Sequence, residues 1–139
     1  MNLHTTQQLR YDIMSRPLKV LLTKQDLIKV IVAEVETEYG YSVDLSNRRK
    51  ENILLVHLIY YIVRYKFSQY KITCEELSQV FNRSTSNIVL ACKSIQNAID
   101  TEPLFKEKVN NIKHHIQESL DMRTSIIKTE FLTFHIHLN

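Results

Sequence analysis

The stretch from Ile72 to Ile99 constrains the fold more than any other part of the chain, because its pattern indicates two helices separated by a short break. Thr73 and Glu76 have the spacing of a capping box, in which each side chain accepts a hydrogen bond from the other residue's amide at a helix start. Three apolar residues then recur on one face: Leu77, Val80 and Phe81. This spacing predicts a short amphipathic helix that ends before a polar turn at residues 82–84.

A second, longer helix is predicted after that turn, because Ser84 is of a residue type that caps helix starts. Its apolar residues recur on one face: Ile88, Ala91, Cys92, Ile95 and Ile99. The opposite face and the preceding turn carry small, polar or basic residues: Arg83, Ser86, Asn87, Lys93, Ser94 and Asn97. This arrangement is typical of a helix-turn-helix. Similar helix pairs occur in all-α proteins that bind no nucleic acid, so that alternative stays open.

Glycine and proline are too scarce for a turn-rich β architecture, since the 139 residues include one Gly and two Pro. A chain of this length suits a single domain with a real core. Long periodic runs of Leu, Ile, Glu, Lys and Gln predict instead an all-α helical bundle. We expect an N-terminal arm or weak helix over residues 1–22, a helical domain over 23–122 and a C-terminal tail over 123–139.

Helix-start and helix-stop signals mark the first part of that domain. Thr23, with Asp26 three residues later, predicts a helix that ends at Gly40, because glycine suits the left-handed position after a helix. Its apolar face is expected to hold five residues: Leu27, Ile28, Ile31, Val32 and Val35. The connector over residues 41–46 offers two buried anchors: Val43 and Leu45.

The run from Ile53 to Val63 is apolar almost all round, which predicts the buried centre of the bundle. We expect three tyrosines to pack rather than to stack on bases: Tyr60, Tyr61 and Tyr65. His57 is expected to be a core or interface histidine rather than a ligand. Pro103 then marks another helix start, followed by an apolar stripe: Phe105, Val109, Ile112, Ile116 and Leu120. The alternation from Thr133 to Leu138 predicts a strand or an extended tail that packs against another surface, such as a second subunit.

The basic residues are concentrated between Arg48 and Ile99, where eight Lys and Arg face three Glu. This segment carries a net charge of +5 and the rest −2, since the whole chain is +3. Such a basic middle fits contact with phosphate, although a solvated basic surface would look the same. Arg48, Arg49 and Lys50 begin a helix, where the dipole disfavours positive charge. A phosphate held by the helix amides is one reason for that placement.

The sequence contains no pattern that predicts catalysis, a cofactor or a metal site. One glycine cannot build a phosphate or dinucleotide cradle. Cys74 and Cys92 lack metal-ligand spacing and are expected to be reduced core thiols, and His135 and His137 have no third ligand nearby. The N-terminus has no apolar signal core, and the longest apolar run is too short to cross a bilayer. We therefore expect a cytoplasmic protein that is no enzyme and does not bind membranes.

The order of these pieces resembles the C-terminal DNA-binding domain of the bacterial replication initiator DnaA, a fold related to the Trp repressor. The likeness covers about residues 25–120 and begins at Ser46–Lys50, a basic start to a long apolar helix. It continues through Ile72–Leu77, where the family has a short helix with an acidic residue. Val80–Ile95 is similar to the family signature F-G-G-R-D-H-T-T-V-x-x-A-x-x-K-I.

The chain departs from that signature at the turn and at the start of the second helix. Asn82 stands where the family has a Gly pair, so the turn is one residue shorter. Arg83 matches the family's Arg, but residues 84–87 read Ser-Thr-Ser-Asn in place of Asp-His-Thr-Thr, which faces base edges and phosphate in the family. The resemblance implies docking in a major groove, and it does not extend to the family's usual origin sequence or to its ATPase activity.

Together these features predict a sequence-recognising protein of helix-turn-helix type that binds double-stranded DNA in replication initiation or transcription control. Ser86 and Asn87 are the candidates for base contact, since Asn can bond adenine bidentately. The predicted DNA-binding residues are Arg48, Arg49, Lys50, Arg83, Ser84, Thr85, Ser86, Asn87 and Lys93. A second copy or a replication or regulatory protein would supply further affinity. The alternative is a protein–protein interaction module on a DnaA-like scaffold that no longer reads bases.

Overall fold

A computed structural model describes residues 23–40, 42–44 and 50–138, which are helical apart from short connections and contain no strand. Side chains are described for these residues except 50, 124, 127, 128 and 130–138. The α-helices are α3 (Lys24–Tyr39), α4 (Lys50–Tyr61), α5 (Cys74–Phe81), α6 (Thr85–Thr101) and α7 (Pro103–Leu138). A π-helical turn, η1 (Ile62–Lys66), and a 3-10 turn, η2 (Ser68–Tyr70), follow α4. The all-α prediction is confirmed.

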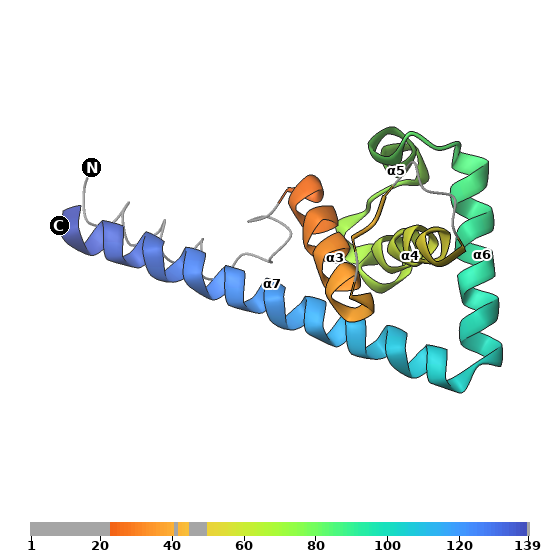
Figure 1. Cartoon of the computed structure of the whole chain (residues 1–139). Coiled ribbons are helices and arrows are strands. Elements are labelled where there is room, and N and C mark those ends of the chain that lie inside the picture. The colour runs from red at the N-terminus through yellow and green to blue at the C-terminus, as the bar shows by residue number, and fades with distance from the viewer. Residues whose placement is uncertain (1–22, 41, 45–49, 139) are drawn as a thin grey trace.

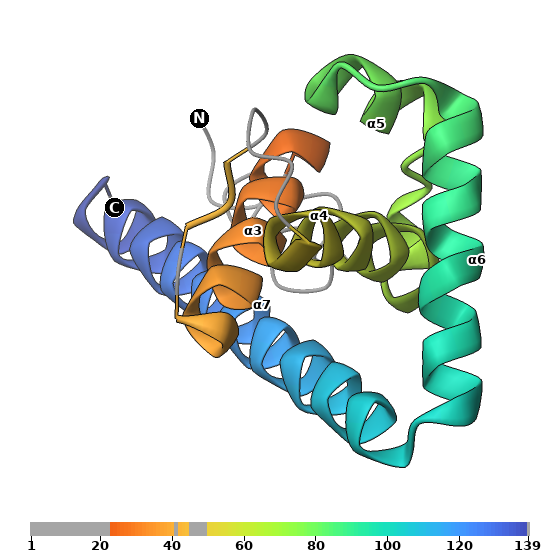
Figure 2. The same cartoon turned by 45° about the vertical axis from the view of Figure 1, so that its right-hand side comes forward.

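The helices are arranged around α4, which packs against α3 on one side and α6 on the other (Figures 1 and 2). The short helix α5 packs on one end of α6, and α7 starts at the other end and crosses back beneath α3. Ser119 Oγ donates to Glu34 of α3 at 2.7 Å, and the Lys108 ammonium lies 4.1 Å from the centre of the Tyr39 ring. These contacts join α3 to α7.

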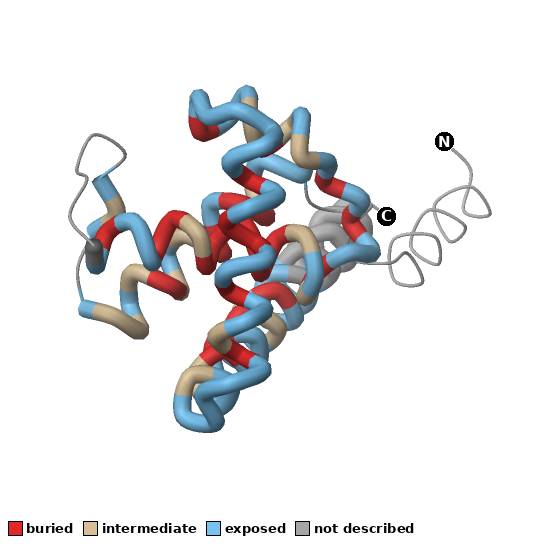
Figure 3. The backbone as a smooth tube through the Cα atoms, turned by 90° about the vertical axis from the view of Figure 1, so that its right-hand side faces the viewer, coloured by how far each residue is buried: buried red, intermediate tan, exposed pale blue. Residues whose placement is uncertain are grey.

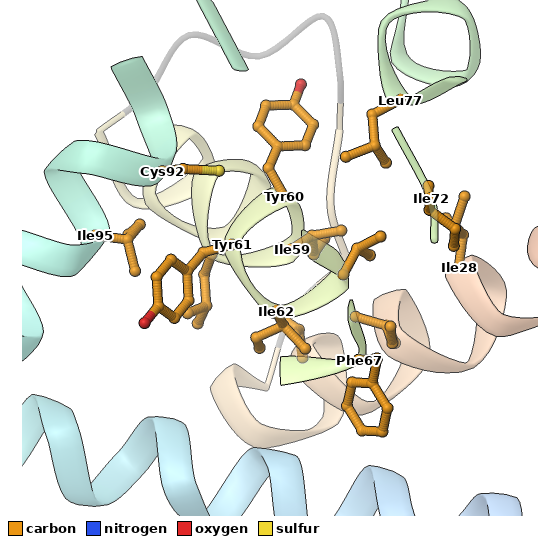
Figure 4. Close-up of a cluster of buried hydrophobic side chains, with 14 of the residues drawn as sticks. Ile28, Ile59, Tyr60, Tyr61, Ile62, Phe67, Ile72, Leu77, Cys92 and Ile95 are labelled. Carbon is orange, nitrogen blue, oxygen red and sulfur yellow. The ribbon is translucent and has the colours of Figure 1, made fainter. Parts of the chain in front are cut away.

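The apolar run of α4 and η1 forms the centre of the core, as predicted. Five of its aliphatic residues have no exposed surface: Leu55, Leu58, Ile59, Ile62 and Val63. In Figure 4 the Tyr61 ring lies beside Ile95 of α6, whereas the Tyr60 ring lies between Cys92 of α6 and Leu77 of α5. The Tyr61 hydroxyl donates to Gln96 at 2.6 Å, which ties α4 to α6. Burial of each of the five aliphatic side chains in this core contributes about 1.5–3 kcal/mol to the free energy of unfolding.

The predicted helix signals are confirmed wherever the structure describes them. Thr73 Oγ1 accepts from the Glu76 amide at 3.1 Å, and the Glu76 carboxylate accepts from the Thr73 amide at 3.3 Å, so the capping box is complete. Thr23 Oγ1 accepts from the Asp26 amide at 3.0 Å. Gly40 has φ +80°, the left-handed conformation that favours glycine. Two buried faces also agree with the predicted stripes: α3 through Leu27, Ile28, Ile31 and Val35, and α7 through Val109, Ile112, Ile116 and Leu120.

The prediction of a strand or extended segment over Thr133–Leu138 is wrong, because α7 continues as a helix to Leu138. The alternation there coincides with helical spacing, since positions 127, 131, 134 and 138 are also apolar. After Pro103 no glycine or proline interrupts the sequence, so nothing local stops the helix. The long helix that precedes this segment therefore continues through it, and the alternation over six residues does not produce a strand.

Several smaller expectations about exposure are also wrong. Val80, predicted on the apolar face of α5, is 46 % exposed. Tyr65 packs as predicted, since its ring stacks on the Tyr61 ring with centroids 5.2 Å apart, but it is 56 % exposed. Ile53 and Leu54 are more than one third exposed at the start of α4, so the helix is buried all round only from Leu55 onward. The predicted arm over residues 1–22 and the predicted anchor Leu45 lie outside the described residues, whereas Val43 is half-buried against the core.

Candidate nucleic-acid interface

The connection between α5 and α6 is three residues long and is held by hydrogen bonds to Ser78 of α5. Asn82 adopts the left-handed conformation at φ +53°, and its amide donates to the Ser78 carbonyl. The Arg83 amide donates to the same carbonyl at 3.2 Å, and the Ser78 hydroxyl donates in turn to the Arg83 carbonyl. Asn is one of the few non-glycine residues that adopt this conformation at low cost. The turn is therefore well defined although it lacks glycine.

The first residues of α6 stand clear of the core. Ser84 caps the helix, with its Oγ accepting from the Asn87 amide at 3.2 Å. The five residues from Arg83 to Asn87 are all exposed, and Ile88 is the first residue of the helix with no exposed surface. The beginning of α6 is thus anchored by Ile88 and the cap, while the side chains before Ile88 face solvent.

The rest of α6 has one buried face and one outer face, as predicted. The buried face consists of Ile88, Ala91, Cys92, Ile95 and Ile99. The outer face carries exposed residues at helical spacing: Ser86, Leu90, Lys93, Ser94 and Asn97. In Figure 3, which views the molecule from the side of α6, exposed and buried residues alternate along the chain. Sequence reasoning did not identify Leu90 as part of this face, although its position between Ser86 and Lys93 places it there.

The charge near this face is positive. Between Leu77 and Ile99 the sequence contains Arg83 and Lys93 and no acidic residue. The acids that border this stretch are Glu75 and Glu76, in the first turn of α5, and Asp100, near the end of α6. The Asp100 carboxylate accepts from Gln96 at 2.9 Å, and the Glu76 carboxylate accepts from the Lys24 ammonium at 3.0 Å. That hydrogen bond is the main reason why the pKa of Glu76 lies below its ordinary value. The carboxylate of Glu76 is therefore largely offset by Lys24.

Tyr60 of α4 packs against the end of α5, next to the turn. Its ring meets the Phe81 ring edge to face, with centroids 5.1 Å apart, and Phe81 is the last residue of α5. The Tyr60 hydroxyl is buried and has no hydrogen-bond partner among the described residues. Burial raises the pKa of this phenol, and the nearby charge of Arg83 partly opposes the shift. The aromatic pair thus joins the centre of the core to the end of α5.

The structure brings six of the nine predicted DNA-binding residues together at one end and along the outer face of α6: Arg83, Ser84, Thr85, Ser86, Asn87 and Lys93. Arg48 and Arg49 lie outside the described residues. Lys50 begins α4, but its side chain is not described. The structure therefore gathers the predicted base-contacting residues and two basic residues and leaves the basic triplet untested.

The described residues show neither a metal-binding cluster nor a disulfide. No group of three or more His, Cys, Asp or Glu within the described ranges could hold a metal ion. Cys92 is buried and Cys74 half-buried, and both thiols are free. None of the helices in the described part of the chain has the length and apolarity needed to cross a bilayer. The chain matches no protein-family model, no curated protein and no solved structure.

Proposed function

We propose that this chain is a helix-turn-helix protein that binds double-stranded DNA with α6 in the major groove. The observation that carries the proposal is the exposed segment Arg83–Asn87, which lies at the start of α6 and is held by the Ser78 contacts and the Ser84 cap. A helix that enters a major groove reads bases with its N-terminal residues. This segment has the small, polar and basic side chains that such contact needs.

The side chains divide by chemistry into two roles. Ser86 and Asn87 contact base edges, since serine suits several bases and Asn pairs with adenine through two hydrogen bonds. Arg83 and Lys93 contact backbone phosphate and fix the position of α6 on the duplex. Thr85 and the amides at the start of α6 add a further site for a phosphate oxygen. The triplet Arg48–Lys50 belongs to the same proposal as a second set of phosphate contacts near the start of α4.

We further propose that the fold is related to the C-terminal DNA-binding domain of DnaA and to the Trp repressor. The order of a long apolar helix, a short capped helix, a tight turn and a longer helix supports this relationship. Such a protein would act in replication initiation or transcription control without hydrolysing ATP. A second copy or a replication or regulatory protein would add to the affinity of one α6.

The test measures fluorescence anisotropy of a labelled random-sequence duplex over a series of salt concentrations. The parent is compared with the double variant Arg83→Ala/Lys93→Ala and with Lys106→Ala/Lys113→Ala, which removes the same charge from exposed positions on α7. Each phosphate contact contributes about 0.9 to the slope of log affinity against log salt. We expect the first variant to reduce the slope by about 2 and the second to leave it nearly unchanged.

The same experiment can overturn the proposal. A protein that is folded by circular dichroism and binds no duplex at low salt would contradict it. Equal losses in the two double variants would also contradict it, because the response would then follow net charge and not the position of α6.

A second candidate function is a protein–protein interaction module on the same scaffold. The observation that favours it is the exposure of three large apolar side chains on α5 and α6: Val80, Val89 and Leu90. A surface of that kind would bind a replication or regulatory protein with little dependence on salt. The salt series separates the two candidates, because phosphate contact gives a steep slope and apolar contact does not.

A further inference from the structure

Leu90 is the most exposed apolar residue of α6, with 62 % of its surface accessible. It lies on the outer face, opposite the buried stripe of that helix. Its helical neighbours at i−4, i−3, i+3 and i+4 are all polar and exposed: Ser86, Asn87, Lys93 and Ser94. The leucine therefore stands inside the group of residues that the proposed function assigns to DNA.

We propose that Leu90 contacts the C5-methyl groups of thymine and gives the protein a preference for A·T pairs at that position. This inference rests on the proposed function, because it places α6 in the major groove. The methyl group of thymine is the apolar feature that the major groove displays, and apolar side chains recognise it. Leu90 lies one turn, about 6 Å along the axis, beyond Ser86, so it meets a base pair further along the groove than the first contact.

The surroundings of Leu90 favour DNA over a protein as its occupant. A stable protein interface buries roughly 800 Å² per partner with an apolar centre. Leu90 instead has polar residues at its four helical neighbours, and the other large exposed apolar residue of α6 is Val89. The segment from Leu77 to Ile99 carries two basic residues, and the acids that border it are Glu76 and Asp100. Hydrogen-bonding groups around one apolar contact match an A·T pair, which presents an acceptor, a donor and a methyl group in the major groove.

The test compares two alternating duplexes of equal length, (dA-dT)₁₂ and (dA-dU)₁₂, which differ only in the C5-methyl group. Every step of these duplexes is an A·T or A·U pair, so the comparison does not depend on the register of α6. We expect the parent to bind the thymine duplex about three- to tenfold more tightly, as burial of one or two methyl groups implies. In Leu90→Ala the ratio should fall to about one, since the partner of the methyl group is gone.

Leu104→Ala is the matched control. Leu104 is 82 % exposed and lies in the first turn of α7, so the same truncation is made away from the proposed site. This control should keep the parent's ratio. Equal binding of the two duplexes by the parent, or an unchanged ratio in Leu90→Ala, would overturn the thymine contact while leaving DNA binding intact. If neither duplex binds at low salt, the proposed function fails as well, and the exposed leucine would then be assigned to a protein contact.

Discussion

The helices α4 and α6 pack against each other, but they differ in how much of their surface is buried. From Leu55 onward α4 is buried on nearly every side, and its residues are chosen for volume and apolarity. On α6 only one stripe is buried, and the outer face carries Ser86, Leu90 and Lys93 at exposed positions. The fold therefore determines α4 almost completely, whereas it leaves the outer face of α6 free to be selected for a partner.

The difference also applies to two exposed apolar residues outside α4. Val80 and Leu90 are apolar residues that the packing of the domain does not need, since both are exposed next to well-buried neighbours such as Phe81 and Ala91. An apolar residue in solvent at a helix surface is neutral for stability in most cases. On α4 the exposed large apolar residues are Ile53 and Leu54 at its start, and none follows from Leu55 to the end of that helix. Four measurements test how buried and exposed positions of these helices differ.

The largest effect is expected from truncating a leucine in each helix. Leu58→Ala in α4 should lower the free energy of unfolding by about 2–5 kcal/mol, because the side chain has no exposed surface and leaves a cavity. Leu90→Ala in α6 should change it by less than about 0.5 kcal/mol. Urea denaturation followed by circular dichroism measures both. A large loss in Leu90→Ala would show that its side chain contributes to the core, and the contrast between the two helices would fail.

The second effect concerns the buried face of α6 itself. Burial raises the pKa of the Cys92 thiol to about 11. At pH 8 its thiolate is therefore on the order of a hundredfold scarcer than that of an ordinary cysteine. We expect a thiol reagent such as DTNB to modify native Cys74, which is half-buried, well before Cys92. Cys74→Ala and Cys92→Ala assign the two rates, and 6 M guanidinium should make them equal. Fast modification of Cys92 in the native protein would contradict the burial of this face.

Much of the fold was predictable because it follows from local chemistry. The capping box at Thr73, the cap at Thr23 and Gly40 after α3 are short-range signals, and each is found where the sequence places it. The buried stripe of α6 follows from helical periodicity alone. The π-helical turn over Ile62–Lys66 was not predictable, because its wider hydrogen bond from the Phe67 amide to the Ile62 carbonyl has no short sequence signal.

The candidate site was predictable only in part. The exposed residues Arg83–Asn87 follow from the helix break and the cap, and these are local signals. The exposure of Leu90 depends on which neighbour covers each side of α6, and that is a tertiary property. The relation of the basic triplet at Arg48–Lys50 to α6 depends on residues outside the described ranges. A sequence pattern gives the faces of each helix, but it does not say which face the next helix covers.

The third effect comes from the helix starts. Thr73→Ala and Ser84→Ala should each lower the free energy of unfolding by about 1 kcal/mol, because each removes the acceptor for an amide at the start of α5 or α6. Ser86→Ala is the matched control on α6, since Ser86 is exposed and does not cap the helix. It should leave stability nearly unchanged, while weakening binding to DNA if it contacts a base. The finding that would break the contrast is a loss in Ser86→Ala equal to that in Ser84→Ala.

The smallest effect concerns Glu76, whose carboxylate accepts from Lys24 at 3.0 Å on the surface. Its folded pKa lies below the ordinary value, chiefly because of that hydrogen bond. The carboxylate therefore contributes stability that is present above its unfolded pKa and is lost as the pH falls through the folded pKa. Glu76→Gln keeps a residue suited to the capping box and removes the charge. We expect this variant to lose less stability than the parent on acidification from about pH 5 to pH 3, a range set by the ordinary carboxyl pKa.

Both residues are partly exposed, so solvent screens the pair and the gain should be small. Urea midpoints at the two pH values measure it, and Lys24→Met should reduce the acid-dependent loss in the same direction because it removes the other partner. Glu75→Gln serves as control, since Glu75 is exposed beside Glu76 in the first turn of α5. An equal change in Glu75→Gln would assign the acid sensitivity to the general charge of that turn. A change confined to the Lys24 and Glu76 variants would show that this pair joins the first turn of α5 to α3. Because α5 packs on α6, the pair would also help to hold the start of α6 in place.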